Sequence, residues 1–203
     1  ELAGLLQKLF DARVEITGTA KSADNVILLG NPKTNPAAKA LLGNGAPKLS
    51  AQGHFLKSVG KNGQLALIVG GGSPAATLWA VYELGYHFGM RSLLHADFPP
   101  TDRPAFSLAG ISRVSEPNLD IRAWRVLAPS PAGPESWSLT DHQQRLRQLA
   151  KLKFNRIVLS LETWQPFVHF EHRGIAKQTG VLWHGNSFPV DGETAGRAAF
   201  GRD

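Results

Sequence analysis

The sequence predicts an α/β protein in two parts, a small mixed sheet with helices on one face and then the first elements of a parallel sheet. Strand-length apolar runs alternate with helical patterns along the whole chain. A proline-rich polar segment, 99–104, separates the two parts, so we expect domains at residues 1–104 and 105–203. Beyond it, a strand–helix–strand succession requires parallel strands joined by a right-handed crossover.

The first part carries clear start and stop signals. Ser73 and Pro74 are typical of the N-cap and first residue of a helix, and Gly89 is typical of its left-handed end. The Asn62–Gly63 pair between two apolar runs predicts a hairpin. In order, we expect a helix over 2–10, strands over 12–17 and 25–29, a helix from Pro36 to Leu42, strands over 55–59 and 64–69, a helix from Pro74 to Phe88, and short strands within 90–94.

In the second part we expect strands over 106–114 and 120–127, a helix over 141–153 and a strand over 156–161. One strand–helix–strand unit is not a finished parallel sheet. Further chain or another subunit should therefore cover its open edge.

Composition excludes several classes of function. The 203 residues include no cysteine, which rules out disulfides, thiolate zinc sites, iron–sulfur clusters and a cysteine nucleophile. No apolar run is long enough to cross a bilayer. The net charge of +6 is modest and scattered, and the basic stretch within 145–156 fits a solvated helix face better than a phosphate-binding patch. We expect no nucleic-acid partner, no membrane span, no metal and no cofactor.

Two motifs have competing interpretations. Gly70–Gly72 with Ser73 and Pro74 lies where phosphate loops occur, but it lacks the P-loop ending and the G-x-G-x-x-G spacing, which favours a tight strand-to-helix turn. His169 and His172 would share one face of a helix as metal ligands, yet no H-E-x-x-H accompanies them. The G-x-S-x-G elbow of serine hydrolases is also absent from the sequence.

Glu162 is the carboxylate of greatest interest. It ends the apolar run IVLSLE, and Trp164 follows two residues later. A carboxylate beside an indole is the composition of a sugar subsite, because hydroxyls need bidentate acceptors and pyranose faces stack on aromatic rings. The alternative is a capping or ion-paired glutamate with the tryptophan in the core.

Two strings resemble known carbohydrate-active enzymes. The string G-G-S-P-A-A-T-L-W-A-V-Y-E-L-G-Y-H-F-G-M-R resembles the end of the small α/β domain before the barrel in family 67 α-glucuronidases and family 20 β-hexosaminidases. Ala76 and Trp79 stand where glycine and tyrosine are frequent in that pattern. The later string L-A-K-L-K-F-N-R-I-V-L-S-L resembles the first barrel helix and second barrel strand of such hydrolases.

The resemblance implies an accessory α/β domain at 1–104 and the incomplete start of a (β/α)₈ barrel at 105–203, in a glycoside hydrolase acting on a polysaccharide or oligosaccharide. It implies an extracellular or periplasmic location, with a signal peptide removed. It assigns no catalytic residue here, since the acid/base carboxylates of those families lie on later barrel strands. The substrate-facing candidates are Arg122, Trp124, Glu162, Trp164, His184 and Asn186. The alternative is a non-enzymatic carbohydrate-binding or scaffold domain.

Overall fold

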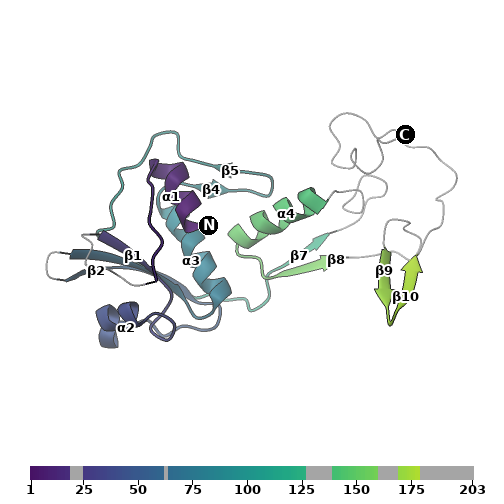
Figure 1. Cartoon of the computed structure of the whole chain (residues 1–203), viewed down its shortest axis with the longest axis horizontal. Helices are drawn as coiled ribbons and strands as arrows, with labels where there is room; N and C mark the ends of the chain where they lie inside the picture. The colour runs from purple at the N-terminus through teal and green to yellow at the C-terminus, as the bar shows by residue number, and fades with distance from the viewer. Residues whose placement is uncertain (19–24, 62–63, 127–138, 160–168, 179–203) are drawn as a thin grey trace. The chain divides into compact units, whose positions relative to one another are not determined.

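The computed structural model describes residues 1–18, 25–61, 64–126, 139–159 and 169–178. These residues fall into two compact units, Glu1–Asp120 and Ile121–Asp203 (Figure 1). The combination of helices with mixed sheets agrees with the α/β class expected from the sequence.

A four-stranded mixed sheet forms the centre of the first unit. Its strands are β1 (Asn25–Leu29), β2 (His54–Lys61), β3 (Gln64–Gly71) and β6 (Ser112–Ser115), in the order β1-β3-β2-β6. β1 is parallel to β3, whereas β2 is antiparallel to both β3 and β6. The pairing of Lys61 with Gln64 confirms the predicted hairpin. A small antiparallel pair, β4 (Arg91–Ser92) and β5 (Asp97–Phe98), lies outside this sheet.

Helices cover both faces of the sheet, which corrects the expectation of helices on one face only. Alternate residues of β3 point to opposite faces. Leu67 and Val69 pack with α1 (Leu2–Phe10) and α3 (Pro74–His87), whereas Ile68 packs with α2 (Pro36–Leu42). A 3₁₀ turn, η1 (Gly43–Gly45), follows α2. In Figure 1, α2 lies across the sheet from α1 and α3.

Both ends of α3 match the signals in the sequence. The Ser73 hydroxyl oxygen accepts a hydrogen bond from the Ala76 amide at 3.2 Å. At the other end Gly89 is left-handed, with φ 89°. Its amide donates to the Tyr86 carbonyl at 3.1 Å and the Met90 amide donates to the Gly85 carbonyl at 2.9 Å, which is the Schellman arrangement.

The glycines before α3 allow close backbone approach. A Cβ on Gly71 would lie 2.4 Å from the carbonyl carbon of Ala76, and one on Gly72 would lie 1.8 Å from the Ser50 carbonyl oxygen. Neither distance is possible for a real side chain. The motif is the tight strand-to-helix turn that its spacing favours.

Two segments differ from the sequence expectations. Residues 12–17 form no strand, and Ile16 is 85% exposed, because alternation by itself supplies no partner strand. The segment 105–120 belongs to the first unit, since β6 pairs with β2 and Leu108 and Ile111 lie in the core with α3. The boundary therefore follows Asp120 rather than residue 104.

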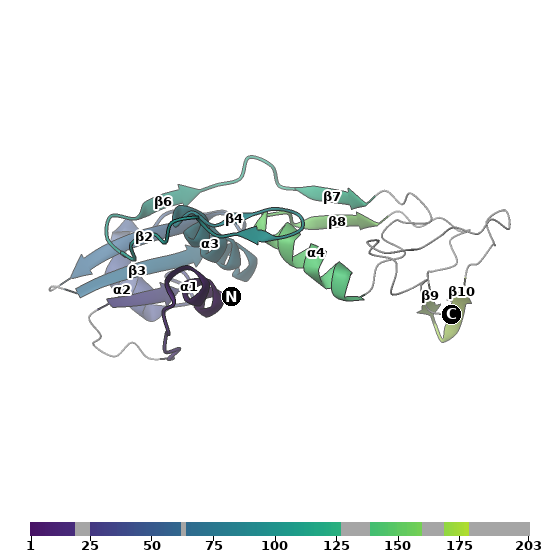
Figure 2. The ribbon, with the colours of Figure 1, turned by 90° about the horizontal axis from the view of Figure 1, so that it is seen from above.

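The second unit contains the predicted strand–helix–strand succession. β7 (Ala123–Val126) and β8 (Arg156–Leu159) are parallel, and α4 (Leu139–Lys151) lies between them in the chain. Figure 2 shows the two strands side by side. A hairpin of β9 (His169–His172) and β10 (Ile175–Gln178) turns at Arg173 and Gly174, whose φ angles of 52° and 74° fit a type I′ turn.

Candidate functional site

Two of the six residues predicted from the sequence to face substrate lie in the described part of the chain. Arg122 immediately precedes β7, and its guanidinium Nε donates to the Lys153 carbonyl at 2.7 Å. Trp124, in β7, meets the Phe154 ring edge to face, with ring centres 5.7 Å apart. Glu162, Trp164, His184 and Asn186 lie outside the described residues.

Arg122 helps to bring the chain from α4 into β8. Its amide donates to the Asn155 side-chain oxygen at 2.8 Å, and its carbonyl accepts from the Asn155 amide at 3.0 Å. Lys153, whose carbonyl the guanidinium binds, is left-handed at φ 66°. These bonds lie at the amino end of the β7–β8 pair, opposite the end from which Glu162 follows.

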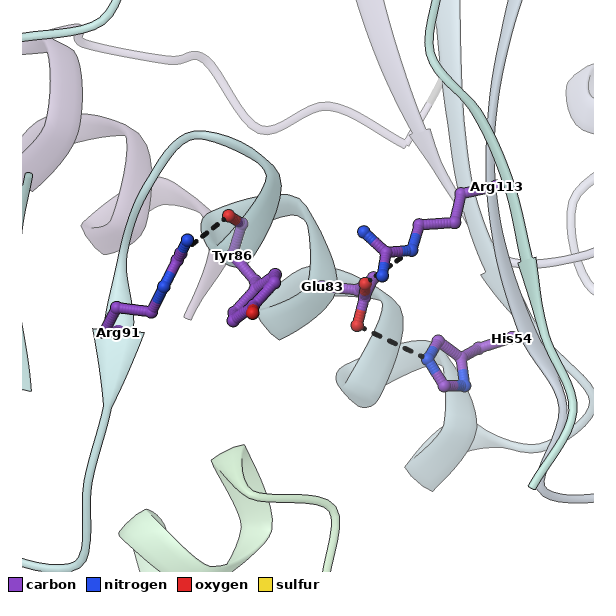
Figure 3. Close-up of polar contacts among 5 residues, drawn as sticks. All are labelled: His54, Glu83, Tyr86, Arg91 and Arg113. Carbon is purple, nitrogen blue, oxygen red and sulfur yellow. Dashed lines mark hydrogen bonds and ion pairs between the residues drawn. The ribbon is translucent and has the colours of Figure 1, made fainter. Parts of the chain in front are cut away.

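The most developed polar arrangement in the described residues is in the first unit, and sequence reasoning missed it. It consists of five residues from β2, α3, β4 and β6, and we call it the Glu83 cluster (Figure 3): His54, Glu83, Tyr86, Arg91 and Arg113.

Strand register explains why three of these residues meet. His54 and Leu56 are two apart on β2, so both face α3. Arg113 on β6 is paired with Leu56 and therefore lies on the same face. Glu83 projects from α3 between them. One signal was visible in the sequence, because Glu83 is the only acidic residue in a helix whose other residues are mostly apolar.

Glu83 is the electrostatic centre of the cluster. Its carboxylate is buried and accepts a hydrogen bond from Arg113 Nε at 2.8 Å. The other carboxylate oxygen lies 4.0 Å from His54 Nε2. His54 is also buried, and neither ring nitrogen has a hydrogen-bond partner among the described residues. Because Glu83 and His54 are out of reach of solvent, these two groups are suited to joining β2, β6 and α3 rather than to contacting a substrate.

The outer half of the cluster is accessible. The Arg91 guanidinium carbon lies 3.9 Å from the centre of the Tyr86 ring, and that of Arg113 lies 6.0 Å from it. Arg91 Nη1 donates to the carbonyls of Tyr86 and Met90 at 3.0 and 2.9 Å. Two guanidinium groups are thus held near one half-exposed phenol.

The described residues contain no group of three or more histidine, aspartate or glutamate side chains that could hold a metal ion. His169 and His172 lie on strand β9, so the helix face on which they were considered as ligands is not formed. Within the same residues, no helix is long and apolar enough to cross a membrane.

No protein-family model matches the chain, and no curated protein is significantly similar to it.

Proposed function

We propose that this chain is the N-terminal part of a carbohydrate-active glycoside hydrolase, with its catalytic carboxylates outside these 203 residues. The observation that carries the proposal is the parallel β7–α4–β8 unit, which follows an α/β unit with its own core. A single parallel pair is incomplete as a sheet, and the start of a (β/α)₈ barrel is a fold in which such a pair is continued.

The register of the pair supports a substrate side at its carboxyl edge. Val126 pairs with Leu159, so both strands end at the same edge. In barrels of this class, substrates bind at the carboxyl ends of the strands. Glu162 and Trp164 come three and five residues after Leu159 in the sequence, which supports an acceptor for sugar hydroxyls beside a ring for stacking.

The other candidates take different parts in this proposal. His184 and Asn186, next to Trp183, are further sugar-facing groups. Arg122 supports the amino end of the pair through its bond to Lys153, and Trp124 supports the same region through Phe154. We place the enzyme outside the cytoplasm, where polysaccharides are degraded.

Calorimetric titration and turnover assays test the proposal, using the protein translated from the full reading frame and a panel of uronic-acid and amino-sugar glycans. Glu162→Gln and Trp164→Ala should each weaken binding or turnover by about 1–3 kcal/mol, the scale of a charged hydrogen bond or a stacking surface. Glu15→Gln, at an exposed position of the first unit, is the matched control and should change neither.

Three outcomes are informative. Hydrolysis that the two variants impair supports the enzyme. Binding without turnover by the full-length protein favours a carbohydrate-binding or scaffold protein. Unchanged affinity together with a lowered melting temperature would assign Glu162 and Trp164 to structure and overturn the proposed site.

A further inference from the structure

β6 is an edge strand of the first unit. It pairs with β2 on one side, and among the described residues no strand pairs with its other side. Its residues are largely accessible, with Val114 57% exposed. An edge of this kind presents amide and carbonyl groups to which an extended segment can add.

The hydrogen-bond pattern identifies the groups that point outward. The Ser58 amide donates to the Ile111 carbonyl at 2.7 Å, so the backbone groups of Ile111 face β2. In an antiparallel ladder this direction alternates from residue to residue. Arg113 therefore also bonds toward β2, whereas the N–H and C=O of Ser112 and Val114 face away from the sheet.

The side chains beside this edge select for negative charge. Arg113 is on β6 itself, and its side chain is half exposed even though Nε is bonded to Glu83. In the Glu83 cluster the Tyr86 ring lies beside it, 6.0 Å from its guanidinium carbon, and Arg91 lies on the other side of that ring. The Glu83 carboxylate and two backbone carbonyls fix the guanidinium groups, so little conformational entropy is lost when they bind a ligand. The terminal nitrogens of a guanidinium group have the spacing to bind the two oxygens of a carboxylate.

We propose that the β6 edge is a docking site for an extended acidic segment of a partner protein, which adds as a strand beside Val114. Main-chain bonds to Ser112 and Val114 supply the ladder. Carboxylates at alternate positions of the segment lie on one face of a strand, where one of them meets Arg113, and Arg91 beyond the Tyr86 ring adds positive charge on that side.

Charge favours this occupant over a second copy of the chain. Two β6 edges paired antiparallel about a two-fold axis would bring Arg113 close to its own counterpart, and like charges across strands are destabilising. The chain as a whole carries a net charge of +6, which also attracts acidic partners and repels copies.

The test uses the whole chain and two fluorescent ten-residue peptides, one with glutamate at every second position and threonine between, the other with glutamine in place of glutamate. Anisotropy should show that the glutamate peptide binds about tenfold or more tightly than the glutamine peptide, since charge-assisted hydrogen bonds are lost in the latter. The affinity of the glutamate peptide should also fall as the salt concentration is raised.

Four variants examine the two halves of the site. Val114→Pro removes an outward N–H without touching the ladder to β2 and should reduce affinity about fivefold or more, while Val114→Thr keeps the N–H and should bind like the natural chain. Arg91→Gln should also weaken binding of the glutamate peptide. The double variant Glu83→Gln with Arg113→Gln should do so without leaving a buried charge unpaired, and thermal melts check that each variant is folded.

Equal binding of the two peptides, or wild-type affinity in folded Val114→Pro, would overturn the proposal. Sedimentation of the chain without peptide measures whether it forms dimers. A concentration-dependent dimer that Val114→Pro abolishes would assign this edge to a second copy and would equally overturn it. None of these results depends on glycan binding, so this proposal and the proposed function fail separately.

Discussion

In the first unit, β3 runs through the middle of a sheet that has helices on both faces, and its residues from Leu67 to Gly71 are buried. In the second unit, β7 and β8 form a two-stranded parallel pair. Within α4 only Gln148 and Leu149 are buried, while Leu139 and Leu146 are more than half exposed.

This difference follows from the type of sheet. In a mixed sheet, a hairpin pairs two neighbouring strands without a long connection, and short helices then cover the two faces of the sheet. Parallel strands need cover on both faces and neighbours at both edges, and among the described residues of the second unit one parallel pair and one helix provide neither. The first unit therefore has a core of its own, whereas the described part of the second leaves apolar side chains of α4 exposed.

The largest effect should come from separating the units. Residues 1–120 expressed alone should melt in one cooperative transition, because the core clusters lie within them. Residues 121–203 alone should aggregate or stay molten, because an unpaired parallel pair exposes edges and apolar surface. Calorimetry and near-ultraviolet circular dichroism measure both. A monomeric, sharply melting second fragment would remove the contrast and with it the incomplete-barrel interpretation.

Moving the end of the first fragment sharpens the boundary. A fragment of residues 1–104 lacks β6 and loses Leu108 and Ile111 from the core. Burying two such side chains contributes about 3–6 kcal/mol. Denaturant unfolding should therefore show the shorter fragment less stable than 1–120 by at least this amount, or already unfolded. Equal stability would return the boundary to residue 104.

The same substitution in the two units should have different costs. Leu84 is fully buried in the core of the first unit, whereas Leu146 is 52% exposed on α4. Leu84→Ala should cost about 2–5 kcal/mol because it leaves a cavity. Leu146→Ala should stay within about 0.5 kcal/mol, as is usual for surface positions. Comparable losses of unfolding free energy in the whole chain would mean that the Leu146 side of α4 is covered.

The smallest effect is a pH dependence confined to the first unit. Burial, with the nearby charges of Glu1 and Asp97 adding to it, raises the pKa of Tyr82 from 10.0 to about 12. A raised pKa means that the folded state favours the neutral phenol. Its contribution to stability is complete below pH 10 and is lost as the pH rises toward 12.

Tyr86→Phe leaves Tyr82 as the single tyrosine, so phenolate absorbance reports on it alone. In a chain still folded at high pH, ionisation should occur near pH 12. Tyr82→Phe should remove this part of the alkaline loss of stability. Ionisation near pH 10 in the folded protein would show that the ring is open to water.

Much of the local structure could be predicted from sequence because short-range rules decide it. Asn35 caps α2 with bonds to the Ala37 and Ala38 amides, as the Asn–Pro pair predicts. Gly89 takes the left-handed conformation that other residues resist. The hairpin and the parallel β7–β8 pair follow from loop length and from the helix between the strands.

The tertiary structure decided what depends on partners distant in sequence. α2 lies across the sheet from α3 because both faces of β3 are apolar, and each face packs against a different helix. The apolar pattern of β3 does not say which helix covers which face. β6 pairs with β2 in the first unit, where Arg113 forms an ion pair with Glu83 and Ile111 packs in the core. The Glu83 cluster could not be predicted from sequence spacing, since His54, Glu83 and Arg113 come from β2, α3 and β6, which only the folded sheet brings together. Neighbouring residues determine local conformation, such as caps and turns. The packing of the whole unit determines which strands and which charged side chains pair when they are far apart in the chain.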